Sequence, residues 1–332
     1  MMIRWYCPLV MVLLTGAPLH VRAQEFTVQV AHPAFAEATG PRVRWDIAHF
    51  NAHRWDMHAF IELLKKDGFR LAFQSERWTR PALDSADLVI IAGPLAVDRD
   101  SLIAKGALDP ARRFEHYWWS DEGRQSALTS VEVEALVTWV RAGGSLLLIL
   151  DHAPSAEAAR TLSEALGVEV RNGMTWDDGR RPPEYTYIDN RRASHILFSR
   201  DYASLGDHPI LEGRMSSERV DRVATYVGSS LLGPLGSSPL LLLSAESFDY
   251  WRNPPERGGG EHRVTAAGRA QAVAFSLDSG RVVVVAEFTP FQARRGGSGD
   301  PDGRIGAGMA YAGAQDQQFV TNIGRWLAKV IP

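Results

Sequence analysis

Cysteine is almost absent from this 332-residue sequence, and Cys7 is the single exception. Cys7 lies in the apolar opening segment and does not follow the small residues of a lipoprotein cleavage site, which argues against a lipid anchor. The rest of the chain therefore offers no disulfide, no thiolate zinc site and no cysteine nucleophile. Any chemistry in it has to use other groups.

Long apolar runs are also missing beyond the opening segment. In that segment Arg4 precedes a short apolar stretch, and Val21 and Ala23 occupy the small-residue positions of a signal-peptidase site. The stretch is too short to span a bilayer comfortably. We expect residues 1–23 to be a cleaved signal peptide, the mature chain to have no transmembrane segment, and the protein to be secreted or periplasmic.

A strong excess of positive charge is lacking as well, since the formal net charge is −3 and no basic patch or RNA-binding aromatic motif is present. These features predict no nucleic-acid partner. The glycine-rich segments lack the Lys and Ser/Thr of a phosphate-binding loop, and there is no GxSxG motif, so a hydrolase serine is not expected. With 45% hydrophobic residues, the chain has the composition of a globular protein.

Strand-like and helix-like segments alternate through the first half. Strand candidates such as 87–93 are apolar on both faces, and a helix over 129–143 opens with Thr129 and Glu132 at capping-box spacing. This alternation predicts an α/β fold, with a doubly wound, mostly parallel sheet that carries helices on both faces. We expect one domain over residues 24–332.

The second half is less regular, and we expect an irregular, loop-rich insertion at about 172–270, with strand candidates at 222–228 and 239–245. Before it, the segment 156–167 predicts one continuous helix. After it, the sequence over 270–288 has the form of a hairpin with its turn at Asp278–Gly280, and a helical apolar stripe follows near the carboxyl end.

Polar clusters follow three of the predicted strands. In the first cluster, His49, Asn51 and His53 alternate, so an extended backbone would point all three to one side. His49 and His53 suggest a divalent metal as a cofactor, with nearby carboxylates as further ligands or proton carriers. Asn51 is a candidate substrate contact.

The second cluster is Asp151 and His152, directly after the apolar run 145–150. Ligands of open α/β sheets collect at the carboxyl ends of strands, and the third cluster, with Glu287 and Gln292, is expected at the same edge. There His152 would be a general base, Asp151 would orient it or bind a metal, Glu287 would be the acid, and Gln292 a substrate contact. The structural alternative, equally weighted, is that Asp151 only caps the next helix.

The segment 114–124 concentrates aromatic residues, among them Trp118 and Trp119. Their faces suit stacking on a sugar ring, although a hydrophobic lid over the sheet edge fits the same pattern. Both tryptophans are candidate substrate-binding residues.

The segments "DIAHFNAHRWDMHAFIELLKKDGF", "LTSVEVEALVTWVRAGGSLLLILDHAPSAEAARTLSEALGVEV", "GRVVVVAEFTPFQAR" and "GMAYAGAQDQQFVTNIGRWL" resemble landmarks of a bacterial domain-of-unknown-function family, secreted or membrane-tethered, related to class I glutamine amidotransferases. The wider group includes domains of gliding-motility transporter accessories and intraflagellar transport proteins. The resemblance implies a flavodoxin-like, amidotransferase-like sheet with a ligand site at the strand tips. True amidotransferases carry a cysteine nucleophile there. Asp151 and His152 stand in its place, so glutaminase chemistry is not expected.

Three functions remain open from the sequence. The first is a hydrolase that activates water at Asp151 and His152. The second is a noncatalytic module that binds a small molecule or glycan at the same edge, and it would tolerate loss of His152. The third is an accessory component of an envelope complex, which predicts a protein partner and a large exposed apolar patch.

Overall fold

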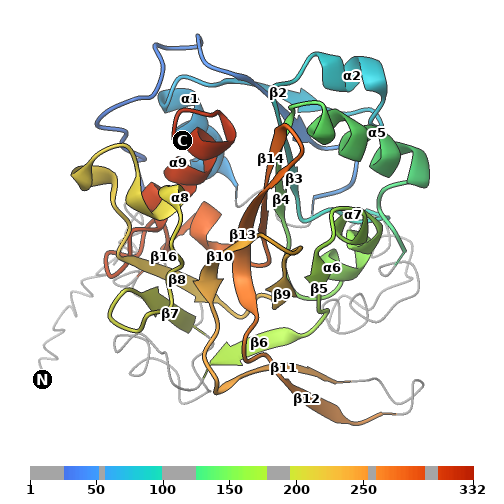
Figure 1. Ribbon diagram of the computed structural model, residues 1–332, viewed down its shortest axis with the longest axis vertical. Coiled ribbons are helices and arrows are strands. Elements are labelled where there is room, and N and C mark those ends of the chain that lie inside the picture. Colours follow the sequence, from blue (N-terminus) through green and yellow to red (C-terminus); the bar gives the residue numbers. More distant parts are fainter. Residues whose placement is uncertain (1–25, 52–56, 99–124, 178–194, 253–258, 296–305) are drawn as a thin grey trace, which may run out of the picture.

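The computed structural model describes residues 26–51, 57–98, 125–177, 195–252, 259–295 and 306–332 (Figure 1). His53, Trp118, Trp119 and the expected signal peptide lie outside these residues, so the predictions made for them stay predictions. Within the described part, none of the helices combines the length and apolar character needed to cross a membrane.

A large mixed sheet forms the centre of the molecule, with strand order β2-β1-β3-β4-β14-β13-β9-β5 and β10 paired to β13. Neighbours from β2 to β14 are parallel, and only β13 and β5 run against the other strands, so the sheet is mostly parallel as predicted. Its strands are β1 (Arg42–Asp46), β2 (Arg70–Gln74), β3 (Leu88–Ala92), β4 (Ser145–Ile149), β5 (Glu169–Val170), β9 (Leu231–Leu232), β10 (Ser238–Leu242), β13 (Ala270–Leu277) and β14 (Gly280–Val285).

Apolar side chains pack on both faces of this sheet. In β3, Ile90 contributes to one hydrophobic cluster together with residues of α1 and α9, and Ile91 contributes to a second cluster with residues of α2, α5 and α7. Because successive strand residues point to opposite faces, a strand that is apolar throughout needs such covering on both sides. The helices are α1 (His58–Lys66), α2 (Arg80–Asp84), α5 (Ser130–Arg141), α6 (Ser155–Ala158), α7 (Arg160–Ala165), α8 (Pro209–Glu212) and α9 (Asp316–Leu327).

Several local predictions are confirmed. Thr129 and Glu132 form both halves of the capping box at the start of α5, and β13 and β14 form the expected hairpin. The predicted helix over 156–167 is wrong in its continuity, because it is broken at Ala159 into α6 and α7.

The region expected to be a loop-rich insertion contains more regular structure than its sequence suggested. Figure 1 shows β11 and β12 reaching away from the large sheet. The strands expected over 222–228 and 239–245 are confirmed as Arg222–Tyr226 and Ser238–Leu242. Glycine, proline and charged residues dominate the connecting segments, which concealed the other short strands. Besides α8, β9 and β10, the region contains the sheet β12-β11-β6, the pair β7-β8 and a 3-10 turn, over β6 (Met174–Asp177), β7 (His195–Ser199), η2 (Ser216–Glu218), β8 (Arg222–Tyr226), β11 (Ser247–Arg252) and β12 (Glu261–Thr265). After the region come the 3-10 turn η4 (Thr289–Phe291) and the paired strands β15 (Ala293–Arg294) and β16 (Ala307–Gly308).

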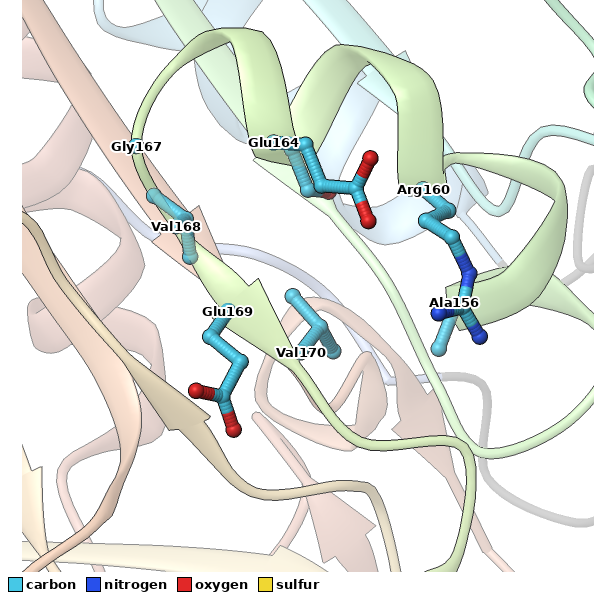
Figure 2. Close-up of a pocket in the computed structure, with 8 residues that line it drawn as sticks. Ala156, Arg160, Glu164, Gly167, Val168, Glu169 and Val170 are labelled. Atoms are coloured by element: carbon cyan, nitrogen blue, oxygen red, sulfur yellow. The ribbon is translucent and has the colours of Figure 1, made fainter.

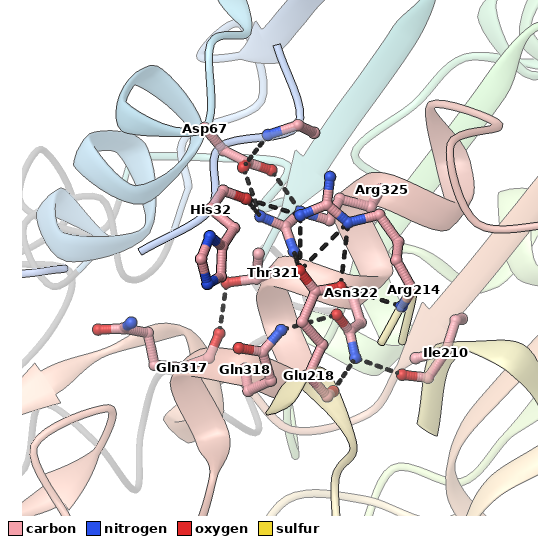
Figure 3. A network of polar contacts seen from close by, with 11 residues as sticks. His32, Asp67, Ile210, Arg214, Glu218, Gln317, Gln318, Thr321, Asn322 and Arg325 are labelled. Atoms are coloured by element: carbon pink, nitrogen blue, oxygen red, sulfur yellow. Dashed lines mark hydrogen bonds and ion pairs between the residues drawn. The ribbon is translucent and has the colours of Figure 1, made fainter. Parts of the chain in front are cut away.

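A buried ionic network fastens α9 to the rest of the molecule (Figure 3). The Arg325 guanidinium donates to both carboxylate oxygens of Asp67, at 2.9 and 2.7 Å, and its Nη1 lies 2.8 Å from Oε1 of Glu218. Arg325 also donates to the carbonyl oxygen of His32 at 2.8 Å. The network thus joins the segment before β1, the end of α1, the turn η2 and the helix α9.

Candidate functional site at the strand tips

Two carboxylates lie at the tips of the adjacent parallel strands β4 and β14. Ile149 pairs with Val285 in the register of these strands, and Asp151 and Glu287 each follow two residues later. Both side chains are buried, at 4% and 0% exposure. The structure therefore brings together two of the predicted catalytic residues at the carboxyl edge of the sheet, where ligands of such folds bind.

Glu287 is held by backbone donors on both sides. The amide of Thr289 donates to its Oε1 at 2.6 Å, and the amide of Tyr226 donates to its Oε2 at 3.1 Å. Burial raises the pKa of Glu287 well above its ordinary value, the negative charge of Asp151 raises it further, and the two amide donors only partly oppose this. Glu287 consequently retains a proton at pH values where an ordinary glutamate is ionised.

The turn after β4 positions His152 next to this pair. Asp151 Oδ1 accepts a hydrogen bond from the amide of His152 at 2.7 Å, while the Nε2 of His152 lies 3.9 Å from Asp151 Oδ2. The Nδ1 of His152 lies 2.9 Å from the carbonyl oxygen of Ala153, which can only accept, so we assign the proton to Nδ1. This tautomer leaves the lone pair on Nε2, on the side of Asp151.

The alternative that Asp151 only caps the next helix is wrong. Helix α6 begins at Ser155 after Pro154, and no side chain caps it. Asp151 instead accepts from the residue directly after it, which stiffens the turn that carries His152.

A strained segment, which the sequence did not single out, packs against the carboxylate pair. Val227 and Gly228 have φ angles of 57° and 51°. For a β-branched residue such as valine this left-handed conformation is rare. A Cβ on Gly228 would lie 2.8 Å from Cβ of Glu287 and 2.7 Å from the oxygen of Ala286, so only glycine fits there. Strain of this kind clusters at functional sites.

His49 lies in an ionic clamp, with both ring nitrogens within ion-pair distance of carboxylates. Its Nδ1 lies 3.0 Å from either oxygen of Asp46, and its Nε2 lies 3.1 Å from Oε1 of Glu132. Burial lowers the pKa of His49, but the two carboxylates outweigh burial and raise it overall. A protonated imidazole has no lone pair for a metal, so this geometry fits a cation between two anions.

The extended backbone expected over His49 and Asn51, which would point their side chains to one side, is not present. Strand β1 ends at Asp46, and Phe50 has a φ of 41°, which interrupts an extended backbone. Among the residues that the structure describes, no group of three or more His, Cys, Asp or Glu is arranged to hold a metal ion. The part of the metal prediction that depends on His53 concerns a residue outside the described ones.

Glu132, whose spacing from Thr129 predicts only a helix cap, is also part of this ionic clamp. Besides the capping box, its Oε1 accepts from the amide of Trp78 at 3.0 Å and its Oε2 accepts from Arg77 at 2.9 Å. Glu132 thereby connects the start of α5 to the tip of β1 through His49. No local pattern in the sequence indicates this pairing, because Asp46 and Glu132 lie far apart along the chain.

The two predicted polar contacts, Asn51 and Gln292, are both buried, at 8% and 0% exposure. Gln292 follows η4, the turn whose Thr289 amide binds Glu287. The Nε2 and Oε1 atoms of Gln292 have no hydrogen-bond partner among the residues that the structure describes. Buried polar atoms are nearly always paired, so Gln292 is an exception that needs a cause.

A pocket of about 260 Å³ lies between the α6–α7 segment and β5 (Figure 2). None of the predicted site residues lines it. Two of its charged side chains already have ionic partners, since Arg160 pairs with Glu157 and Glu169 pairs with Arg269. We therefore place the candidate site at the strand tips and not in this pocket.

The comparisons with known proteins concern the architecture. No family model and no curated protein matches the chain. Among solved structures, the mmIFT52 N-terminal domain aligns with 86% of this chain and 97% of its own, at 12% identity and a TM-score of 0.51. At that identity the likeness concerns the fold and no activity.

Two further solved structures align at lower scores. A putative ThuA-like protein from Bacteroides uniformis has 12% identity and a TM-score of 0.41, with 91% of this chain and 94% of its own covered. A putative GMP synthase protein from Thermoplasma acidophilum has 8% identity and a TM-score of 0.37, with 88% and 95% covered.

Proposed function

We propose that this protein is a secreted or periplasmic hydrolase of amidotransferase-like, doubly wound architecture, which attacks a small polar substrate with water at Asp151, His152 and Glu287. The observation that carries the proposal is the pair Asp151 and Glu287, buried at neighbouring strand tips, with the pKa of Glu287 raised by burial and by Asp151. Strongly perturbed carboxylates at the ligand-binding edge of an α/β sheet are typical of catalytic sites.

The three side chains divide the proton transfers of hydrolysis between them. Nε2 of His152 accepts a proton from water as the water oxygen bonds to the substrate. Asp151, 3.9 Å from that nitrogen, stabilises the imidazolium that forms. Glu287 enters the step protonated and gives its proton to the leaving group when the bond breaks. The proton of His152 then returns to Glu287 through water, and the site is restored.

The strain in the neighbouring segment supports the same location. Val227 holds a conformation that costs free energy, and the amide just before it, that of Tyr226, binds Glu287.

The test is a screen of the mature chain against chromogenic esters, anilides and glycosides, with the variants His152→Ala, Asp151→Asn and Glu287→Gln. We expect each variant to lose roughly 10²- to 10⁴-fold in kcat/KM, the usual contribution of a general acid or base. His58→Ala, an exposed histidine, is the matched control and should be unaffected. Activity that survives in all three variants would place catalysis elsewhere, and inactivity on every substrate would favour the second function.

That second function is a noncatalytic module for a small molecule or glycan. The observation in its favour is the engagement of both Glu287 oxygens by backbone amides in a side chain with 0% exposure. A module of this kind binds its ligand without turnover and keeps its affinity in His152→Ala. A hydrolase turns its substrate over, and His152→Ala abolishes this turnover while binding remains.

The secretion and metal proposals have their own measurements. Amino-terminal sequencing of the protein from a periplasmic fraction should begin at Gln24, and an intact Met1 would contradict the cleaved signal. Elemental analysis that compares the metal content of the wild type with that of a His49→Ala and His152→Ala double variant tests the proposed metal site. Stoichiometric metal lost in the variant would support the metal site, and equal content in both would exclude these ligands.

A further inference from the structure

Two buried side chains that follow the carboxylates Asp151 and Glu287 along the chain have unpaired hydrogen-bonding groups. Ser155 is 1% exposed and Gln292 is 0% exposed. Within the described part of the chain, the Ser155 hydroxyl and both polar atoms of the Gln292 amide have no hydrogen-bond partner. A hydroxyl and a carboxamide can each donate and accept hydrogen bonds, so several buried donors and acceptors are left unpaired here.

Each of these residues lies about one turn beyond one of the two carboxylates. The amide of Ser155 donates to the carbonyl oxygen of His152, just after Asp151. The amide of Gln292 donates to the carbonyl oxygen of Thr289, whose own amide binds Glu287. The two strand tips that hold the carboxylates therefore each lead directly to a side chain without a partner.

Two other buried side chains of the same residue types have hydrogen-bond partners. Gln271, also 0% exposed, accepts from Thr225 at 2.7 Å and donates to the carbonyl oxygen of Val227 at 3.1 Å. Ser163, 1% exposed, donates to the carbonyl oxygen of Ala159 at 3.1 Å. Burial alone therefore does not leave a glutamine or a serine side chain without partners in this protein.

We propose that Ser155 and Gln292 are ligand-binding residues that, with Asp151 and Glu287, recognise the hydroxyl groups of an uncharged polyol. The inference rests on the strand-tip location of the proposed function but not on hydrolysis, and it names the class of ligand. Hydroxyls both donate and accept, so adjacent hydroxyls satisfy the amide oxygen and the amide nitrogen of Gln292 together. An anionic ligand is disfavoured by Asp151, whose charge already acts on Glu287.

Stability measurements of the unliganded protein test whether the Ser155 and Gln292 side chains are unpaired before a ligand binds. Replacing a buried polar group that has no partner by an apolar group of similar shape is close to neutral or stabilising. We expect Gln292→Leu and Ser155→Ala to leave the urea midpoint of unfolding unchanged or to raise it. The matched controls Gln271→Leu and Ser163→Ala break existing bonds and should lower it. If Gln292→Leu lowered the urea midpoint as much as Gln271→Leu, Gln292 would already be hydrogen-bonded to internal water, and the proposal would be overturned.

Calorimetric titration of the mature chain tests the class of ligand, with D-sorbitol as the probe and sorbitol 6-phosphate as its anionic comparator. We expect sorbitol to bind, the phosphate ester to bind more weakly, and Gln292→Leu to weaken sorbitol at least tenfold, the effect of an unpaired ligand group. No sorbitol binding to the wild type, or unchanged binding to Gln292→Leu, would refute the ligand class. His152→Ala separates the two ideas, since it should bind sorbitol normally even where it abolishes hydrolysis.

Discussion

Asp151 and Glu287 are neighbours because the strands that precede them are parallel and in register. Ile149 faces Val285 across β4 and β14, and each carboxylate follows two residues later. Parallel strands end at one edge of a sheet, so two acidic residues distant in the chain share one buried environment. Their mutual repulsion is visible in the raised pKa of Glu287, for which burial is the first cause and Asp151 the second.

Removing the charge of Asp151 should change how stability depends on pH. The folded-state pKa of Glu287 is raised, so the folded protein loses stability as pH rises from the ordinary glutamate value through the folded one. In Asp151→Asn the pKa of Glu287 falls back toward its ordinary value, and the loss becomes smaller. Urea unfolding at pH 5 and pH 8 measures this, with the exposed Asp278→Asn as control. An unchanged pH dependence would mean that the two carboxylates do not interact.

The ionic clamp around His49 also predicts that folding stability decreases as pH rises. Because the two carboxylates raise the pKa of His49 despite burial, its contribution to stability is complete below the ordinary histidine pKa and is lost as pH rises through the folded value. His49→Gln leaves Asp46 and Glu132 without their cation, which should cost about 3 kcal/mol at pH 6. The cost should be smaller at pH 9. The exposed His58→Gln should show neither effect.

His208 should make the fold sensitive to acid. Burial lowers its pKa to about 4, with a further contribution from Arg281, and its Nδ1 accepts from the amide of Ile210 at 3.2 Å. Stability should therefore fall as pH drops from about 6.5 toward 4, because the unfolded chain binds the proton more readily. His208→Asn keeps an acceptor for this amide and removes the titration. We expect its unfolding free energy to fall less between pH 7 and pH 4.5, by about 2 kcal/mol; an identical fall would disprove this role.

Arg325 should not be replaceable by lysine. Its guanidinium binds both oxygens of Asp67 as well as Glu218 and His32, and lysine cannot supply that planar set of donors. Thermal unfolding of Arg325→Lys should show a loss of about 3 kcal/mol. The exposed pair of Arg141 and Asp278 offers the comparison, since Arg141→Lys should change stability by about 0.5 kcal/mol or less. Equal effects at both positions would contradict a structural role for the buried network.

Features with a local signature were predictable from the sequence. The capping box of Thr129 and Glu132, the hairpin of β13 and β14, and the run of apolar strands depend on residues close together in the chain, and all are confirmed. The position of the carboxylate pair also followed, because strand ends can be read from the end of an apolar run.

What escaped prediction depends on contacts between distant residues. Asp46, His49 and Glu132 meet only after β1 and α5 are placed in three dimensions, so the sequence suggested a metal ligand where the structure has an ion clamp. The strain at Val227 is likewise invisible in a sequence, because valine after a strand normally indicates more strand.

The position of β14 has a consequence for how the chain reaches its native state. This strand, residues 280–285, is the partner of β4, which ends at residue 149, and it separates β4 from β13. During synthesis the edge of β4 consequently stays without its neighbour while more than a third of the chain is still being added. An unpaired apolar strand edge is a site of aggregation, and long-range pairing is slow. Fragments that end before residue 280 should therefore be insoluble, even though they contain most of the parallel sheet.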